Sequence, residues 1–329
     1  MNWMRVGAAA LVTGACALLV ACGSGVVSSL DFQEGSQDRS DPASDRGRIM
    51  VVGDDFSDFG QNNGYVYTVR DGSRNWVQEL AQHYGVTIKT ANAGGWGYAQ
   101  GHARVDGADT TSGTNAPSVN EQVTLLLSQA GGTLRGNDAV FINGGMWDII
   151  DAVEGQNSAE AQEARDAVEA AARALATQVR RLVDAGAGHV AVTGVYDLGT
   201  SPWAAPWGRS EPRKGGAVTD LTLLFNNSLL LDLENKGGAA LLYLDAAQFY
   251  RFAYDDDKHE RFGISNRQDP FCPAPESMAG CDAPADSSSY DAYLFADDVH
   301  FTPAIWRWFG DDDVGENAYQ RFSDRWGRP

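Results

Sequence analysis

The chain has 329 residues and carries 25 Lys and Arg against 44 Asp and Glu, a formal net charge of −19. This length fits one α/β domain with room for a leader and a linker. Because so acidic a surface repels nucleic acid, nucleic acid is not among the expected partners.

The first 21 residues have the composition of a targeting segment. Arg5 precedes an apolar stretch over residues 6–21 that is short for a membrane span, and Leu-Val-Ala-Cys occupies residues 19–22. This ending resembles a bacterial lipoprotein signal, which implies lipidation of Cys22 and attachment to a membrane. Gly23 follows the cysteine, which by analogy favours the outer membrane. The alternative is an ordinary secretory signal with a chance cysteine.

We divide the chain into a signal over residues 1–21, a tether over residues 22–47 and one domain over residues 48–329. The tether is rich in Gly, Ser, Asp, Gln and Arg and has few apolar positions. A segment of this composition cannot bury a core, so we expect it to be flexible.

Apolar runs alternate with helical patterns through the domain. Strands are expected at residues 49–52, 86–90, 139–142, 189–195 and 239–244. Helices are expected at residues 75–84, 118–130, 158–185 and 219–234. This alternation predicts a mostly parallel sheet covered by helices. Functional loops are then expected where strands end, at residues 53–60, 143–148 and 197–202.

The first of these loops carries the most informative motif. Residues 53–58 read Gly-Asp-Asp-Phe-Ser-Asp after a buried strand. The motif resembles the first block of the GDSL, or SGNH, esterase–lipase family, which reads Gly-Asp-Ser-Leu-Ser-Asp. The resemblance implies a flavodoxin-like three-layer α/β/α fold and hydrolysis of ester bonds. It also places Asp55 where the family has its serine nucleophile.

The block nearest the C-terminus is the best match to the family. Residues 293–303 contain Asp297 and His300, in the spacing of the family's Asp-x-x-His segment. The resemblance implies that Asp297 orients the imidazole and that His300 is the general base. A carboxylate on one ring nitrogen leaves the other free to accept a proton.

The two middle blocks, which supply oxyanion donors in the family, are altered. In the third block Trp147 stands where the family has an Asn, while Asn143 lies on the strand end and is expected to point elsewhere. The second block can be aligned with Gly97 or with His102 at the oxyanion position. We prefer His102, because the residues around it match the family better.

These substitutions leave several interpretations of the site open. A serine esterase needs a hydroxyl beside the base and donors aimed at the oxyanion. Ser57 could take the place of the nucleophile, although the geometry of the strand end should point its side chain away from the site. Asp55 could itself attack as a carboxylate. Asp55, His102 and His300 could bind a metal, but an ion pair between Asp55 and His300 is the simpler expectation. We predict no metal and no cofactor.

Two cysteines remain near the end of the domain. Cys272 and Cys281 lie in a loop rich in Pro and Gly, and in an exported chain such a pair suggests a disulfide. No neighbouring His or Cys completes a tetrahedral metal site.

Two functions therefore follow from the sequence. One is a lipid-anchored ester hydrolase with a rebuilt site, and the other is a non-catalytic protein that binds a small ester, acyl or glycan ligand in the old cleft. If Asp55 and His300 meet, the pKa of the imidazole should rise and that of the carboxyl should fall. The imidazolium would then be unable to act as a base.

Overall fold

The computed structural model describes residues 30–39, 46–109, 112–156, 161–204, 212–234, 238–255, 263–272, 278–283, 287–311 and 317–327. The expected signal over residues 1–21 and the expected lipidation site Cys22 lie outside these residues. No helix among the described residues has both the length and the apolar character that crossing a membrane requires.

A four-stranded parallel sheet forms the centre of the domain. Its order is β2 (Ile49–Val52), β5 (Ala139–Ile142), β6 (His189–Thr193) and β7 (Leu241–Leu244). β2 and β5 are buried along their whole length, as continuous apolar runs in a parallel sheet should be. Four of the five expected strands are thus confirmed.

The remaining expected strand, at residues 86–90, is not part of this sheet. β4 covers only Val86–Thr87 and pairs with β1 (Gly35–Ser36). The place beside β2 is taken by the following segment, where the Tyr98 N–H donates to the Val51 carbonyl at 2.7 Å and the Val51 N–H donates to the Trp96 carbonyl at 3.1 Å. The chain turns back within a few residues between these two segments. The apolar run at residues 86–90 alone therefore cannot show which of them pairs with β2.

The expectation of a flexible tether is wrong for residues 30–39. Phe32 is buried and its ring meets Tyr84 edge-on at 5.2 Å. The buried Gln37 side chain accepts the Ile49 N–H at 2.9 Å, at the start of β2. One aromatic ring and one amide are enough to dock this segment, although its average composition is that of a linker.

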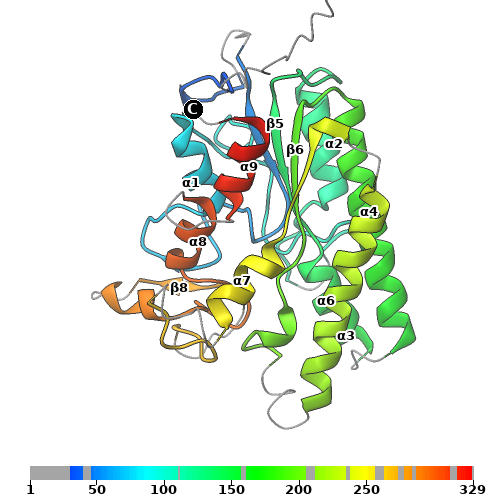
Figure 1. Cartoon of the computed structure of the whole chain (residues 1–329), viewed down its shortest axis with the longest axis vertical. Helices are drawn as coiled ribbons and strands as arrows, with labels where there is room; N and C mark the ends of the chain where they lie inside the picture. The colour runs from blue at the N-terminus through cyan, green and yellow to red at the C-terminus, as the bar shows by residue number, and fades with distance from the viewer. Residues whose placement is uncertain are drawn as a thin grey trace, which may run out of the picture.

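Helices cover both faces of the sheet (Figure 1). One face carries α2 (Val119–Gln129), α3 (Met146–Gln156), α4 (Gln162–Asp184) and α6 (Pro212–Leu233). The other carries α1 (Trp76–His83), α7 (Ala246–Tyr254), α8 (Pro303–Gly310) and α9 (Ala318–Trp326). The chain therefore has the expected three-layer α/β/α fold.

Local signals explain where two of these helices begin. Asn75 and Gln78 form a capping box at α1, and Ser118 and Glu121 form another at α2. Four of the helices, α3, α7, α8 and α9, were not expected from the sequence. α3 begins inside the predicted loop at residues 143–148, because this apolar stretch packs against α4 and α6.

Shorter elements complete the described structure. A second small sheet pairs β3 (Val69–Arg70) with β8 (Cys281–Asp282). Three 3-10 turns, η1, η2 and η4, cover Leu198–Thr200, Gly238–Ala240 and Ser287–Ala292.

Candidate functional site

Asp55 lies in the turn that follows β2, at the carboxyl end of the sheet. The turn begins at Gly53, whose φ is +154° and where a Cβ would collide with the Asn143 side chain. The Gln122 amide of α2 holds this glycine from both sides: its Oε1 accepts the Gly53 N–H at 2.7 Å, and its Nε2 donates to the Gly53 carbonyl at 2.9 Å. A distant helix therefore helps to position the turn that carries Asp55.

Each oxygen of the Asp55 carboxylate has a partner. Oδ1 lies 3.2 Å from Nε2 of His300. Oδ2 accepts the backbone N–H of His102 at 2.8 Å and also the indole N–H of Trp147. Two donors thus converge on one oxygen, in the manner of an oxyanion hole that is occupied by a carboxylate of the protein itself.

His300 is held between two carboxylates. Its Nδ1 lies 2.7 Å from Oδ2 of Asp297, which also accepts the Gly280 N–H at 2.5 Å. The other oxygen of Asp297 accepts the backbone N–H groups of Val299 and His300, at 2.9 and 2.7 Å. The Asp297–His300 geometry is that of an oriented imidazole, but the second ring nitrogen faces Asp55.

The electrostatics of this cluster follow from its burial and its charges. Burial lowers the pKa of His300, but Asp297 and Asp55 outweigh that effect and raise it to about 10. Burial raises the pKa of Asp55, but the hydrogen bond and charge of His300, helped by His102, bring it below the usual value. The expected ion pair is present, and the imidazole is cationic at neutral pH.

Aromatic rings seal the pair from solvent. Asp55 and His300 are each 2% exposed. The His102 ring lies against Trp147 with 4.1 Å between ring centroids, and Tyr67 packs 5.3 Å from His300. His102 has a φ of +65°, a conformation that favours glycine, so its side chain occupies this position at a cost in backbone strain.

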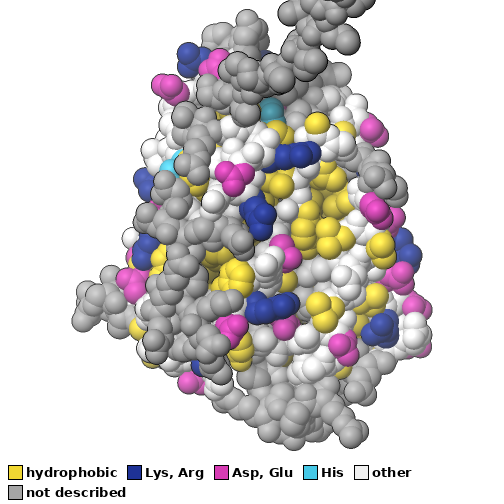
Figure 2. Space-filling model, in the orientation of Figure 1, with side chains coloured by type: hydrophobic (Ala, Val, Ile, Leu, Met, Phe, Trp, Pro, Cys, Tyr) yellow, Lys and Arg dark blue, Asp and Glu magenta, His cyan; other side chains and the backbone are white. Residues whose placement is uncertain are grey.

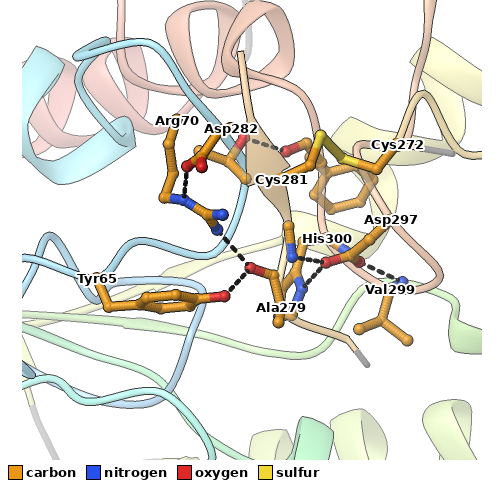
Figure 3. The surroundings of a disulfide bond; sticks show 12 residues. Tyr65, Arg70, Cys272, Ala279, Cys281, Asp282, Asp297, Val299 and His300 are labelled. Carbon is orange, nitrogen blue, oxygen red and sulfur yellow. Dashed lines mark hydrogen bonds and ion pairs between the residues drawn. A yellow bond between two sulfur atoms is a disulfide. The ribbon is translucent and has the colours of Figure 1, made fainter. Parts of the chain in front are cut away.

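The expected disulfide is present, and it lies next to the segment whose backbone contacts Asp297. Cys272 and Cys281 are bonded, with their Cα atoms 5.8 Å apart. Figure 3 shows that the Ala279 carbonyl beside this disulfide accepts hydrogen bonds from Tyr65 at 2.6 Å and Arg70 at 2.8 Å. These contacts fix the segment whose next N–H, at Gly280, donates to Asp297.

Ser57 and Asn143 face away from this cluster. Ser57 is fully buried, and among the described residues its hydroxyl has no hydrogen-bond partner, His300 included. Asn143 donates to Asp54, as its place on the strand end predicted. Neither residue can take part in chemistry at Asp55 without a rearrangement of the loop.

Three further buried carboxyls surround the site, and sequence reasoning gave them no role. Burial and the charge of Asp55 raise the pKa of Asp54 to about 7. Burial raises the pKa of Asp58 to about 7 and that of Asp148 to about 6. The clustering of aspartates in residues 54–58 was the available signal, but only the fold shows that they are buried.

The described residues offer no alternative metal centre. No group of three or more His, Cys, Asp or Glu side chains among them has the arrangement to hold a metal ion. The contact between Asp55 and His300, at 3.2 Å, is that of an ion pair.

Comparisons with known proteins identify the family of this chain. The family described as GDSL-like Lipase/Acylhydrolase matches residues 49–312. No curated protein matches. Thirty chains of solved structures match, one of which, a crystal structure, is 16% identical, with 62% of this chain and 84% of the other covered and a TM-score of 0.39. A similarity of that size supports no functional statement.

Proposed function

Because the chain belongs to the GDSL-like lipase/acylhydrolase family, we propose that its site derives from that of an ester hydrolase but binds a ligand without serine-dependent hydrolysis. The observation that supports this proposal is the position of Asp55. A single carboxylate replaces the nucleophile, occupies the two N–H donors and holds the base as a cation.

Each of these effects opposes ester hydrolysis by itself. The loss of one oxyanion donor alone costs roughly 10²–10³ in rate. Here both donors are already satisfied, and a new oxyanion would have to displace a charged group. A histidine whose pKa is about 10 carries its proton at neutral pH and cannot remove another.

The proposed ligand is a small molecule that carries an ester, acyl or glycan group. His102 is only partly buried, whereas Asp55, Trp147 and His300 are buried, so a ligand would meet the His102 ring first. We further propose that the protein is exported and anchored to the outer membrane through Cys22. Mass analysis of the mature N-terminus tests the anchor, and Cys22→Ser should release the protein from membranes.

Hydrolysis of short-chain p-nitrophenyl esters tests the loss of activity. We expect little or no turnover by the wild type, which lacks the serine nucleophile, and only a small rise in Asp55→Ser, since the Trp147 indole still stands where the family has its Asn donor. The triple variant Asp55→Ser, His102→Gly, Trp147→Asn should regain measurable turnover that a further His300→Ala change abolishes. Turnover by the wild type that His300→Ala abolishes would contradict the proposal.

A second candidate function is hydrolysis with Asp55 as the nucleophile. It is favoured by the arrangement of the carboxylate, in which two donors hold Oδ2 while Oδ1 remains beside His300. Oδ1 would displace the substrate's carboxylate from its alkyl carbon and so form an alkyl ester of Asp55; water attacking the Asp55 carbonyl carbon would then release the alcohol and leave one water oxygen in the Asp55 carboxylate. Turnover in ¹⁸O-labelled water, followed by mass analysis of the peptide containing Asp55, distinguishes the two: incorporated label supports the nucleophile, and unlabelled Asp55 excludes it.

A further inference from the structure

A second surface lies at the opposite end of the sheet from Asp55. α6 runs back along the sheet from the site, and β7 begins after it, so the end of α6 and the start of β7 meet at the amino end of the strands. Between them is an open groove of about 550 Å³, lined mainly by Leu230, Leu231, Leu233, Glu234, Leu241 and Tyr243.

The groove exposes apolar side chains to solvent. Leu231 is 71% exposed and Leu230 is 40% exposed. Figure 2 shows hydrophobic side chains gathered over the part of the molecule where Figure 1 shows β7 and α6, with basic side chains beside them. Contiguous exposed apolar surface is characteristic of sites that contact a protein or a membrane.

The rim of the groove has the residue types found at membrane interfaces. The indole N–H of Trp326 donates to the Ala239 carbonyl at 3.1 Å, and the exposed Arg325 donates to the Gly238 carbonyl at 3.3 Å. Trp and Tyr rings favour the headgroup region of a bilayer, and an Arg there can meet phosphate.

The position of Leu30, the first described residue, relates this surface to the proposed anchor at Cys22. Leu30 lies just before the bridge that joins Phe32 to Gly47, at the amino end of β2. Leu30 follows Cys22 by eight positions in the sequence, and eight fully extended residues span about 28 Å at most. β7 lies three strands from β2, or about 14 Å across the sheet. An anchor at Cys22 therefore holds the groove within reach of the bilayer.

We propose that the groove between α6 and β7 docks on the surface of the bilayer to which Cys22 anchors the chain. The proposal rests on the anchor proposed above. The partner is a zwitterionic lipid surface, because the net charge of −19 repels anionic lipid. Docking at the amino end of the strands points the His102 end of the domain away from the membrane.

The test uses an artificial anchor, so that it does not depend on lipidation of Cys22. Residues 23–329 with an N-terminal hexahistidine tag are bound to phosphatidylcholine–phosphatidylethanolamine vesicles that contain a nickel-chelating lipid. The polarity-sensitive fluorophore NBD is attached to Leu231→Cys; the native Cys272 and Cys281 are bonded and do not react. The matched control is Leu125→Cys, because Leu125 is 48% exposed on α2 and does not line the groove.

We expect the Leu231 label to shift to the blue and to brighten severalfold on vesicles, and the Leu125 label to change little. The added change Leu230→Glu should reduce the response at Leu231. An unchanged Leu231 label, or equal responses at both positions, would overturn the proposal. A response that appears without vesicles as protein concentration rises would assign the groove to a second copy of the chain and would also overturn it.

Discussion

The two sides of the His300 ring differ in where their contacts come from. On the Nδ1 side, Asp297 is three residues away in the sequence and is held largely by N–H groups of its own loop. On the Nε2 side, Asp55 and its two donors come from distant segments. The local side keeps the geometry of a general base, whereas the long-range side is built around a carboxylate.

This difference shows that an intact Asp–His pair does not by itself indicate a working base. The ring nitrogen that must be free is occupied here by a second acid. The buried imidazolium lies between two carboxylates, and removal of either acid would leave buried charge poorly compensated. Four expected outcomes break or sharpen this comparison.

The largest effect is expected from Asp297→Ala. It leaves the imidazolium with one carboxylate and deprives three backbone N–H groups of their acceptor, so we expect a loss of about 3–5 kcal/mol in the free energy of unfolding. Asp55→Ala should cost about 1 kcal/mol less, since one backbone N–H and the indole lose their acceptor. Urea unfolding measures both losses. A larger loss for Asp55→Ala would show that the Nε2 side of the His300 ring contributes more to stability than the Nδ1 side.

The pH dependence of stability should follow the buried acids. The pKa values of Asp54, Asp58 and Asp148 are raised to about 7, 7 and 6, so the stability they contribute is fully present below their usual pKa and is lost as pH rises through 6 to 7. His300 adds a loss at higher pH, as pH rises through about 10. The lowered pKa of Asp55 acts in the opposite sense, since its contribution is lost in acid.

The melting temperature is therefore expected to be highest near pH 4, to fall as pH rises toward 7, and to fall again in stronger acid. Differential scanning calorimetry across this range measures it. A melting temperature that rises from pH 5 to pH 8 would show that these carboxyls ionise freely in the folded state.

A smaller effect is expected from Asp55→Asn. The amide removes one of the two negative charges that raise the pKa of His300, so that pKa should fall, while the contact with Asp297 keeps it above the ordinary value. NMR titration of the His300 ring provides the measurement. An imidazole that titrates identically in the two proteins would mean that Asp55 and His300 are not coupled.

The smallest effect on stability is expected from His102→Gly. The change relieves a strained left-handed backbone, of order 1–3 kcal/mol, but it removes the ring contact with Trp147, of order 0.5–1.5 kcal/mol. The backbone N–H that binds Asp55 remains. We expect urea unfolding to change by about 1 kcal/mol or less, and a loss well above that would give the His102 ring a larger structural role.

The sequence predicted the parts of the molecule that depend on local pattern. The continuous apolar runs of β2, β5 and β6 identified the sheet, and the motifs at residues 53–58 and 293–303 identified the family and the meeting of Asp55 with His300. Each of these signals is contained in a few consecutive residues.

What could not be predicted depends on contacts between distant segments. No pattern in the sequence shows that the Trp147 indole turns toward Asp55, because side-chain rotamers are set by the packing around them. The pairing of β1 with β4 could not be read either, since residues 22–47 as a whole have a linker composition. The burial that raises the pKa of Asp54 appears only when β5 and α3 are in place.

The hold of Gln122 on Gly53 has a consequence for the order of folding. The two residues are 69 positions apart, so their hydrogen bonds form only after a long segment has closed. Until α2 docks, the turn after β2 lacks both hydrogen bonds from the Gln122 side chain to Gly53. We therefore expect the ionic cluster to assemble late, on a scaffold of strands and helices that is already formed.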